Sequence, residues 1–120
     1  MTNPNIIAEN YLALWNDAED KSRRIRLEEN WTADSRYSDP LMAGVGREEI
    51  AAMIASAREQ FPCHAFTLRG TPDAHGRFVR FSWTLAPVGG AAVVGGTDIV
   101  RLDGMGRIAE VIGFLDREEA

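Results

Sequence analysis

Apolar residues recur at helical spacing in the first half of the chain and at alternate positions in the second half. In residues 6–15 they fall on one helical face, and Tyr11 belongs to that face. A second helical segment runs to about Trp31, where Leu27 and Trp31 stand four residues apart above a charged surface. The pattern therefore predicts two consecutive helices, with Tyr11 pointing inward.

A third helix is predicted over residues 47–60, where apolar positions keep one face and acidic residues occupy the first turn. Pro62 ends it. The short stretch 35–38, between the second and third helices, is predicted to be extended. Asp39 stands just before Pro40, which disfavours helical backbone at Asp39, so Asp39 is placed at a strand end or in a loop.

After Pro62 the period changes to two, which is typical of strands with one buried face. Turn signals at residues 71–76, 87–90 and 103–106 divide this half into four strands joined by short loops. We expect one α+β domain over residues 1–120, in which three helices pack on the concave face of a curved antiparallel sheet.

Composition narrows the possible functions. The 120 residues carry 13 Lys and Arg against 18 Asp and Glu, a net charge of −5 that disfavours a nucleic-acid partner. No apolar run is long enough to span a membrane, and no signal peptide is recognised, so no membrane association and a cytoplasmic location are expected. Cys63 is the only cysteine, which excludes an intrachain disulfide, and we expect it to be a small packing residue.

Three side chains are candidates for chemistry. Asp98 interrupts an otherwise apolar row in the strand of residues 92–102, so its carboxyl must be paired, hydrogen-bonded or protonated. It is either a satisfied structural acid or an acid with a raised pKa in a pocket. Asp39 is either a turn-forming residue or a general base at a cavity mouth. Tyr11 is either a core residue or a phenol that donates into a cavity.

Metal and cofactor sites lack a supporting pattern. His64 and His75 are the only histidines, and two ligands do not complete a zinc site. His64 begins a predicted strand and could face a cavity. The glycine pairs at 89–90 and 95–96 do not lie between a strand and a helix, as a phosphate-binding loop requires. No cofactor is expected.

Five segments together resemble the nuclear transport factor two-like superfamily, and more narrowly its SnoaL-like and ketosteroid isomerase-like branch. These segments are Tyr11-Leu-Ala-Leu-Trp15, Arg36-Tyr-Ser-Asp-Pro40, Gly46-Arg-Glu-Glu-Ile50, Gly96-Thr-Asp-Ile-Val-Arg-Leu-Asp103 and Gly106-Arg-Ile108. The resemblance covers nearly the whole chain. It implies a conical, cystatin-like α+β barrel of bent sheet around an apolar cavity, often dimeric. The ligand that this cavity implies is a small apolar molecule.

The ketosteroid isomerase resemblance implies roles for the three candidates. Asp39, before Pro40, matches the catalytic base, which moves a proton at a carbon α to a carbonyl. Tyr11 and a protonated Asp98 match the donors that stabilise the enolate oxygen, a mechanism the ketosteroid isomerases exemplify. The polyketide cyclase branch instead uses a later Asp, which makes Asp98 or Asp116 the candidate. Other members bind a ligand or partner without catalysis.

We therefore expect an isomerase-like or cyclase-like enzyme, or a non-catalytic binding module, acting on a steroid-like or polyketide-like ligand. A homodimer is expected. The side chains expected to line the cavity, besides the three candidates, are Trp15, Trp31, Met53, Phe61, His64, Phe81, Trp83 and Asp116.

Overall fold

Three helices and six strands make up residues 3–116. The computed structural model describes residues 3–116. The elements in chain order are α1 (Pro4–Asn16), α2 (Asp20–Asn30), β1 (Trp31–Ser38), β2 (Ala43–Val45), α3 (Gly46–Gln60), β3 (His64–His75), β4 (Phe78–Pro87), β5 (Val94–Leu102) and β6 (Ile108–Asp116). The three predicted helices and four late strands are confirmed, and the extended segment before Asp39 is longer than expected.

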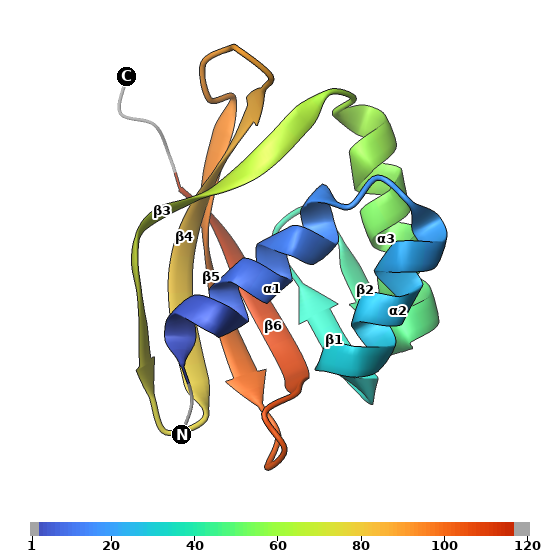
Figure 1. Ribbon diagram of the computed structural model, residues 1–120, viewed down its shortest axis with the longest axis vertical. Coiled ribbons are helices and arrows are strands. Elements are labelled where there is room, and N and C mark those ends of the chain that lie inside the picture. The colour runs from blue at the N-terminus through green and yellow to red at the C-terminus, as the bar shows by residue number, and fades with distance from the viewer. Residues whose placement is uncertain (1–2, 117–120) are drawn as a thin grey trace.

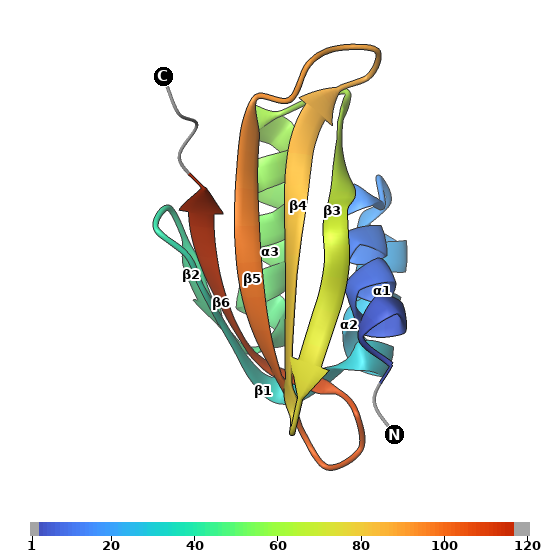
Figure 2. The same cartoon turned by 90° about the vertical axis from the view of Figure 1, so that its left-hand side faces the viewer.

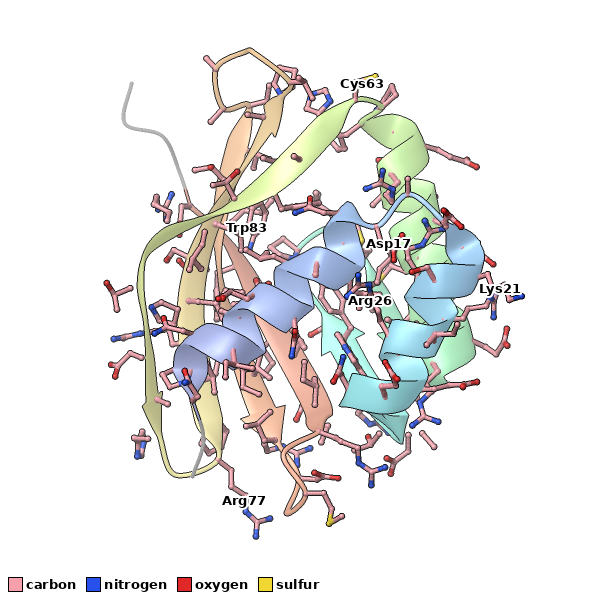
Figure 3. The ribbon with its side chains drawn as sticks, viewed as in Figure 1. Asp17, Lys21, Arg26, Cys63, Arg77 and Trp83 are labelled. Atoms are coloured by element: carbon pink, nitrogen blue, oxygen red, sulfur yellow. The ribbon has the colours of Figure 1, made fainter. Side chains whose placement is uncertain are left out.

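The helices begin and join through polar side chains. The Asn3 side chain caps α1 by accepting hydrogen bonds from two backbone N–H groups of the first turn, and Pro4 occupies the first helical position. Between α1 and α2, Asp17 forms an ion pair with Arg26 at 2.9 Å (Figure 3). The second helix ends one residue before Trp31, which already belongs to β1.

The strands form one sheet in the order β2-β1-β6-β5-β4-β3. All neighbouring pairs are antiparallel except β1 and β6, which run parallel. The expectation of an antiparallel sheet is thus right for the β3–β6 meander and wrong for this pair. Short hairpins fix the direction of β3–β6, whereas most of the chain separates β1 from β6 and leaves their direction free.

The first predicted turn also differs from the structure. Strand β3 continues through residues 71–75, and the chain reverses at Gly76 and Arg77 instead. The register shifts between Arg69 and Asp73, where Gly70 has a φ of 72°. Pro72 is tolerated because β3 is an edge strand, where a missing N–H does not interrupt the ladder.

The helices cover one face of the curved, unclosed sheet, as Figures 1 and 2 show. Helix α1 packs on β3 and β4, and α3 packs on β1. In β4 the inward positions are the alternate apolar residues that the sequence pattern selects: Val79, Phe81, Trp83 and Leu85. The core therefore lies between the helical layer and the sheet.

None of the helices described for residues 3–116 is both long and apolar enough to cross a bilayer.

Candidate functional site

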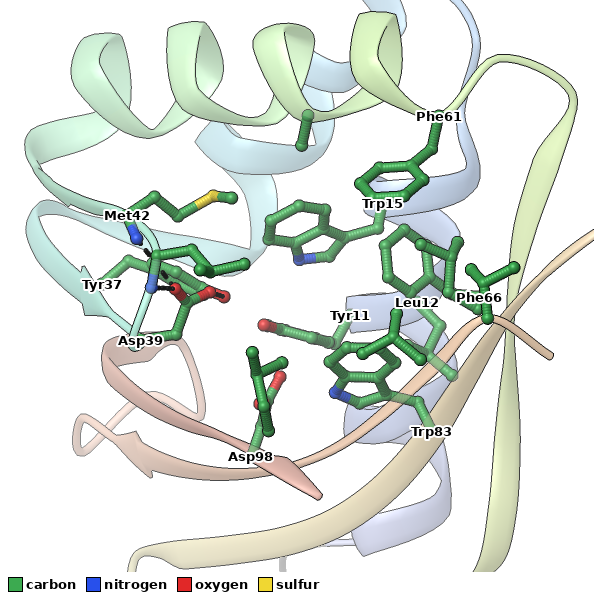
Figure 4. Close-up of a pocket in the computed structure, with 16 residues that line it drawn as sticks. Tyr11, Leu12, Trp15, Tyr37, Asp39, Met42, Phe61, Phe66, Trp83 and Asp98 are labelled. Atoms are coloured by element: carbon green, nitrogen blue, oxygen red, sulfur yellow. Dashed lines mark hydrogen bonds between the residues drawn. The ribbon is translucent and has the colours of Figure 1, made fainter. Parts of the chain in front are cut away.

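A cavity of about 190 Å³ lies between the sheet, α1 and the C-terminal end of α3 (Figure 4). Leu41, Phe61 and Val93 are the exposed members of its lining, so they mark the mouth. Most of the lining is apolar. The full set is Tyr11, Leu12, Trp15, Tyr37, Asp39, Leu41, Met42, Ala57, Phe61, Phe66, Trp83, Leu85, Val93, Val94, Asp98 and Leu115.

In the described part of the chain, three polar atoms of the cavity wall are buried without a hydrogen-bond partner. They are Tyr11 Oη, Trp15 Nε1 and Trp83 Nε1. Figure 4 shows the Tyr11 hydroxyl pointing toward the space between Asp39 and Asp98. A buried donor without an acceptor costs about 1–3 kcal/mol, so an acceptor oxygen on a bound molecule would be favourable here.

Asp98 lies in the wall with an exposed fraction of only 2%. Burial raises the pKa of its carboxyl from 3.8 to about 6, the charge of Asp39 adds to the rise, and the nearby Tyr11 and Trp83 groups oppose it. Neither Tyr11 Oη nor Trp83 Nε1 makes a hydrogen bond within residues 3–116. Burial, and then the charge of Asp98, raises the pKa of Tyr11 well above its ordinary value, which keeps the phenol protonated.

Asp39 has a different environment from Asp98. Its Oδ1 accepts hydrogen bonds from the backbone N–H groups of Leu41 (2.8 Å) and Met42 (2.9 Å). Its Oδ2 accepts one from Tyr37 Oη at 2.5 Å. Asp39 is thus a turn-forming residue, as one of the two predictions had it, and it also lines the cavity, whereas its role as a general base stays a prediction. The pKa of the Tyr37 phenol is raised, mainly by burial and next by the charge of Asp98.

Gly113 allows the two acids to approach each other. In the β5–β6 ladder Gly113 lies directly opposite Asp98, and in the parallel β1–β6 ladder Ser38 pairs with Ile112, which brings Asp39 alongside Gly113. A Cβ at Gly113 would lie 2.8 Å from Asp98 Oδ1 and 3.1 Å from the Asp39 Cβ. The parallel strand pair and the missing side chain together build the acidic end of the cavity.

Comparison with known proteins identifies the family. The sequence profile of the SnoaL-like domain matches residues 8–111. The chain belongs to the SnoaL-like family. A crystal structure of a SnoaL-like family protein from Agrobacterium tumefaciens, named as a candidate isomerase, shares 50% identity, with 98% of this chain and 100% of that chain covered and a TM-score of 0.94. No curated protein matches the chain.

Solved structures of lower sequence identity share the fold of this SnoaL-like domain. A candidate SnoaL-like polyketide cyclase from Jannaschia sp. CCS1 is 21% identical, with 97% and 90% of the two chains covered and a TM-score of 0.72. An NTF2-like protein from Exiguobacterium sp. 255-15 is 16% identical, with 93% and 99% covered and a TM-score of 0.73. These similarities support the predicted α+β architecture.

The cavity of the SnoaL-like domain brings together Tyr11, Asp39 and Asp98, which are distant in the sequence. Three of the eight further residues predicted to line it also do so: Trp15, Phe61 and Trp83. Trp83 lies over Gly96, where a Cβ would be 2.3 Å from the indole Cζ2, so this glycine makes room for the tryptophan. The catalytic roles assigned to Tyr11, Asp39 and Asp98 stay predictions.

The other five residues do not line the cavity of the SnoaL-like domain. Trp31 and Phe81 pack against the Tyr11 ring from outside the cavity, with ring centroids 6.0 and 5.0 Å away. Met53 is buried in the core, one turn of α3 before Ala57, which does line the cavity. His64 Nδ1 lies 2.8 Å from the Pro62 carbonyl oxygen. Asp116 accepts a hydrogen bond from Thr97 Oγ1 at 3.1 Å and contacts Arg69.

The sequence interpretation missed ten residues of the cavity lining, the aromatic Tyr37 and Phe66 among them. Both positions follow from strand alternation: Tyr37 is buried between the exposed Arg36 and Ser38 of β1, and Phe66 precedes Leu68 on the inward face of β3. Cys63 was expected to pack inside, yet it is exposed in a turn with a φ of 61° (Figure 3). Within residues 3–116 no group of three or more His, Cys, Asp or Glu side chains is placed to hold a metal ion.

Proposed function

We propose that this SnoaL-like domain binds a small apolar carbonyl compound and moves a proton at the carbon next to the carbonyl group, with Asp98 as the proton-transfer group. The observation that carries the proposal is the buried Asp98 carboxyl in an apolar cavity wall, with a pKa raised to about 6 by burial. A general base works best when its pKa lies near the working pH. The candidate-isomerase name of the 50% identical relative supports the same reaction class.

Tyr11 is the donor to the carbonyl oxygen. Its hydroxyl has no hydrogen-bond partner among residues 3–116 and points into the cavity (Figure 4). When Asp98 removes the α proton, negative charge develops on the carbonyl oxygen, and a donor already in place stabilises that charge. The carboxyl proton exchanges with water, and Asp98 then returns a proton to the resulting enolate, at the same carbon or at another, so that no oxidant or reductant is consumed.

Asp39 acts as a positioning residue in this proposal. A carboxylate offers about four lone-pair sites, and three hydrogen bonds from Tyr37, Leu41 and Met42 already use most of those on Asp39. It holds the loop after β1 and the Tyr37 phenol against the cavity. This assignment differs from the ketosteroid isomerase resemblance, in which Asp39 is the base, and agrees with the cyclase resemblance, in which a later Asp acts.

The proposed chemistry can be tested without the physiological substrate. Acetophenone, a small neutral ketone with exchangeable α hydrogens, is incubated with the protein in D₂O, and loss of the methyl signal is followed by ¹H NMR. We expect protein-dependent exchange whose rate rises with pH to a plateau, with a midpoint near pH 6 because the carboxylate form of Asp98 is the active one.

Two results would contradict parts of the proposal. Binding of acetophenone, seen by its NMR line broadening, without any exchange would exclude the enzymatic step and favour a non-catalytic binding module. Neither binding nor exchange would exclude the ligand class as well. Exchange that is already maximal at pH 4 would remove Asp98 as the base.

A further inference from the structure

The size of the cavity limits what it can enclose, and this inference rests on the proposed function. The cavity volume is about 190 Å³. An apolar protein cavity of about 150 Å³ holds one benzene molecule. Pockets that enclose drug-sized ligands measure about 300–1,000 Å³. The space therefore suits one ring with a short substituent, and most of a four-ring molecule would remain outside.

The charges in the lining limit the ligand further. Two carboxyl groups, Asp39 and Asp98, face the cavity, and no Lys, Arg or His is among the described residues that line it. A ligand carboxylate or phosphate would lie close to two acids without a cation to pair with, which is costly in a buried site. The electrostatics thus favour a neutral ligand.

The polar and apolar parts of the wall are also segregated. In Figure 4 Tyr37, Asp39 and Asp98 lie on one side of the cavity, with the Tyr11 hydroxyl directed toward them. Phe66 lies on the other side, together with Leu12 and Phe61. A ligand with a single polar end and an apolar body matches this division.

Aromatic side chains form the boundary on the apolar side. The Phe66 ring packs edge-on against Trp15 and against Trp83, with centroid distances of 5.4 and 5.2 Å. All three side chains line the cavity. Phe66 is only partly buried, so it is the member whose removal disturbs the core least.

We infer that the domain is selective for a neutral, single-ring carbonyl compound, and that the aromatic wall of Trp15, Phe66 and Trp83 sets the size limit. The carbonyl group lies at the acidic end beside Tyr11 and Asp98, and the ring lies against the aromatic wall. A steroid-like or polyketide-like body, as the family resemblance implies, exceeds this limit.

The wild-type protein tests both parts of the inference by isothermal titration calorimetry with four probes. Acetophenone should bind about tenfold or more tightly than 1-acetonaphthone, which adds a second ring, and than the four-ring androst-4-ene-3,17-dione. It should also bind about tenfold or more tightly than benzoate, which has the same ring with an anionic group. Equal or tighter binding of the steroid, or of benzoate, would overturn the inference and leave the proposed function standing.

A variant pair tests the role of the aromatic wall. Phe66→Ala should remove the preference for one ring, raising the affinity for 1-acetonaphthone about tenfold relative to acetophenone. Phe78→Ala is the control, because Phe78 is exposed and outside the cavity lining, and it should keep the wild-type ratio. Circular dichroism checks that both variants fold. If Phe66→Ala does not fold, Phe66→Leu takes its place. An unchanged ratio in a folded Phe66 variant would contradict the assigned size limit, whereas failure of every ketone to bind would contradict the proposed function itself.

Discussion

Asp98→Asn lowers the rate of α-hydrogen exchange in acetophenone about a hundredfold to ten-thousandfold, the usual effect of losing a general base. The amide has nearly the same size as the carboxyl but cannot take up a proton at neutral pH. Because the ring and the carbonyl oxygen are held by other groups, the affinity for acetophenone should change little. Exchange measured by ¹H NMR at saturating ketone separates the rate from the affinity.

Two further Asp→Asn variants serve as controls for this result. Asp116→Asn should keep the wild-type rate, because Asp116 bonds with Thr97 and Arg69 outside the cavity lining. Asp39→Asn should lower the rate less than about tenfold, since its amide oxygen can still accept the two backbone N–H groups. A large loss in Asp39→Asn together with a small one in Asp98→Asn would instead identify Asp39 as the base.

The second large effect is a pH-dependent cost in stability. The pKa of Asp98 is about 6 in the folded protein against an ordinary 3.8, so the folded state binds a proton that the unfolded chain releases between these values. Stability is therefore lost as pH rises through this window, not gained. The folded and unfolded pKa values of Asp98 differ by about two units. At about 1.4 kcal/mol per unit, the free energy of unfolding falls by about 3 kcal/mol in total from a pH below both values to a pH above both.

Asp98→Asn removes this pH dependence. The free energy of unfolding of the variant minus that of the wild type should increase by about 2.5 kcal/mol between pH 4 and pH 8. Urea denaturation at a series of pH values measures it. Other acids change the stability in the opposite direction at lower pH. Asp17 is one of them, because its hydrogen bond from Ser22 lowers its pKa to about 2. Their contributions are the same in the variant and the wild type, so they cancel when one free energy of unfolding is subtracted from the other. A difference that stays constant with pH would mean that Asp98 is not perturbed.

Much of the fold could be predicted from local patterns. Helical spacing around Tyr11 and strict alternation around Trp83 select the faces that are buried in the structure. The parallel β1–β6 pair could not be predicted in this way, because its partners are separated by most of the chain and no turn fixes their direction. The continuation of β3 through Pro72 shows that turn residues are also accommodated at a sheet edge.

The candidate site was predictable in part. An acid in an apolar strand row and an Asp before Pro identify Asp98 and Asp39, and both line the cavity. Their nearness depends on Gly113 and on the register of three strands, which no local pattern encodes. Strand alternation says which face a residue takes but not how far along the strand the cavity extends, so Phe81 was included and Phe66 missed. A homodimer and a cytoplasmic location stay predictions.

The central claim is that Asp98 carries a carboxyl whose pKa is raised by burial at the cavity. Titration of the protein with ¹³C-labelled aspartate carboxyls, followed by NMR, measures this directly, and the Asp98 signal is assigned by its loss in Asp98→Asn. We expect a midpoint near pH 6, well separated from the ordinary value of 3.8. A midpoint near 4 would show an ordinary solvated or well-paired carboxylate and would contradict the claim.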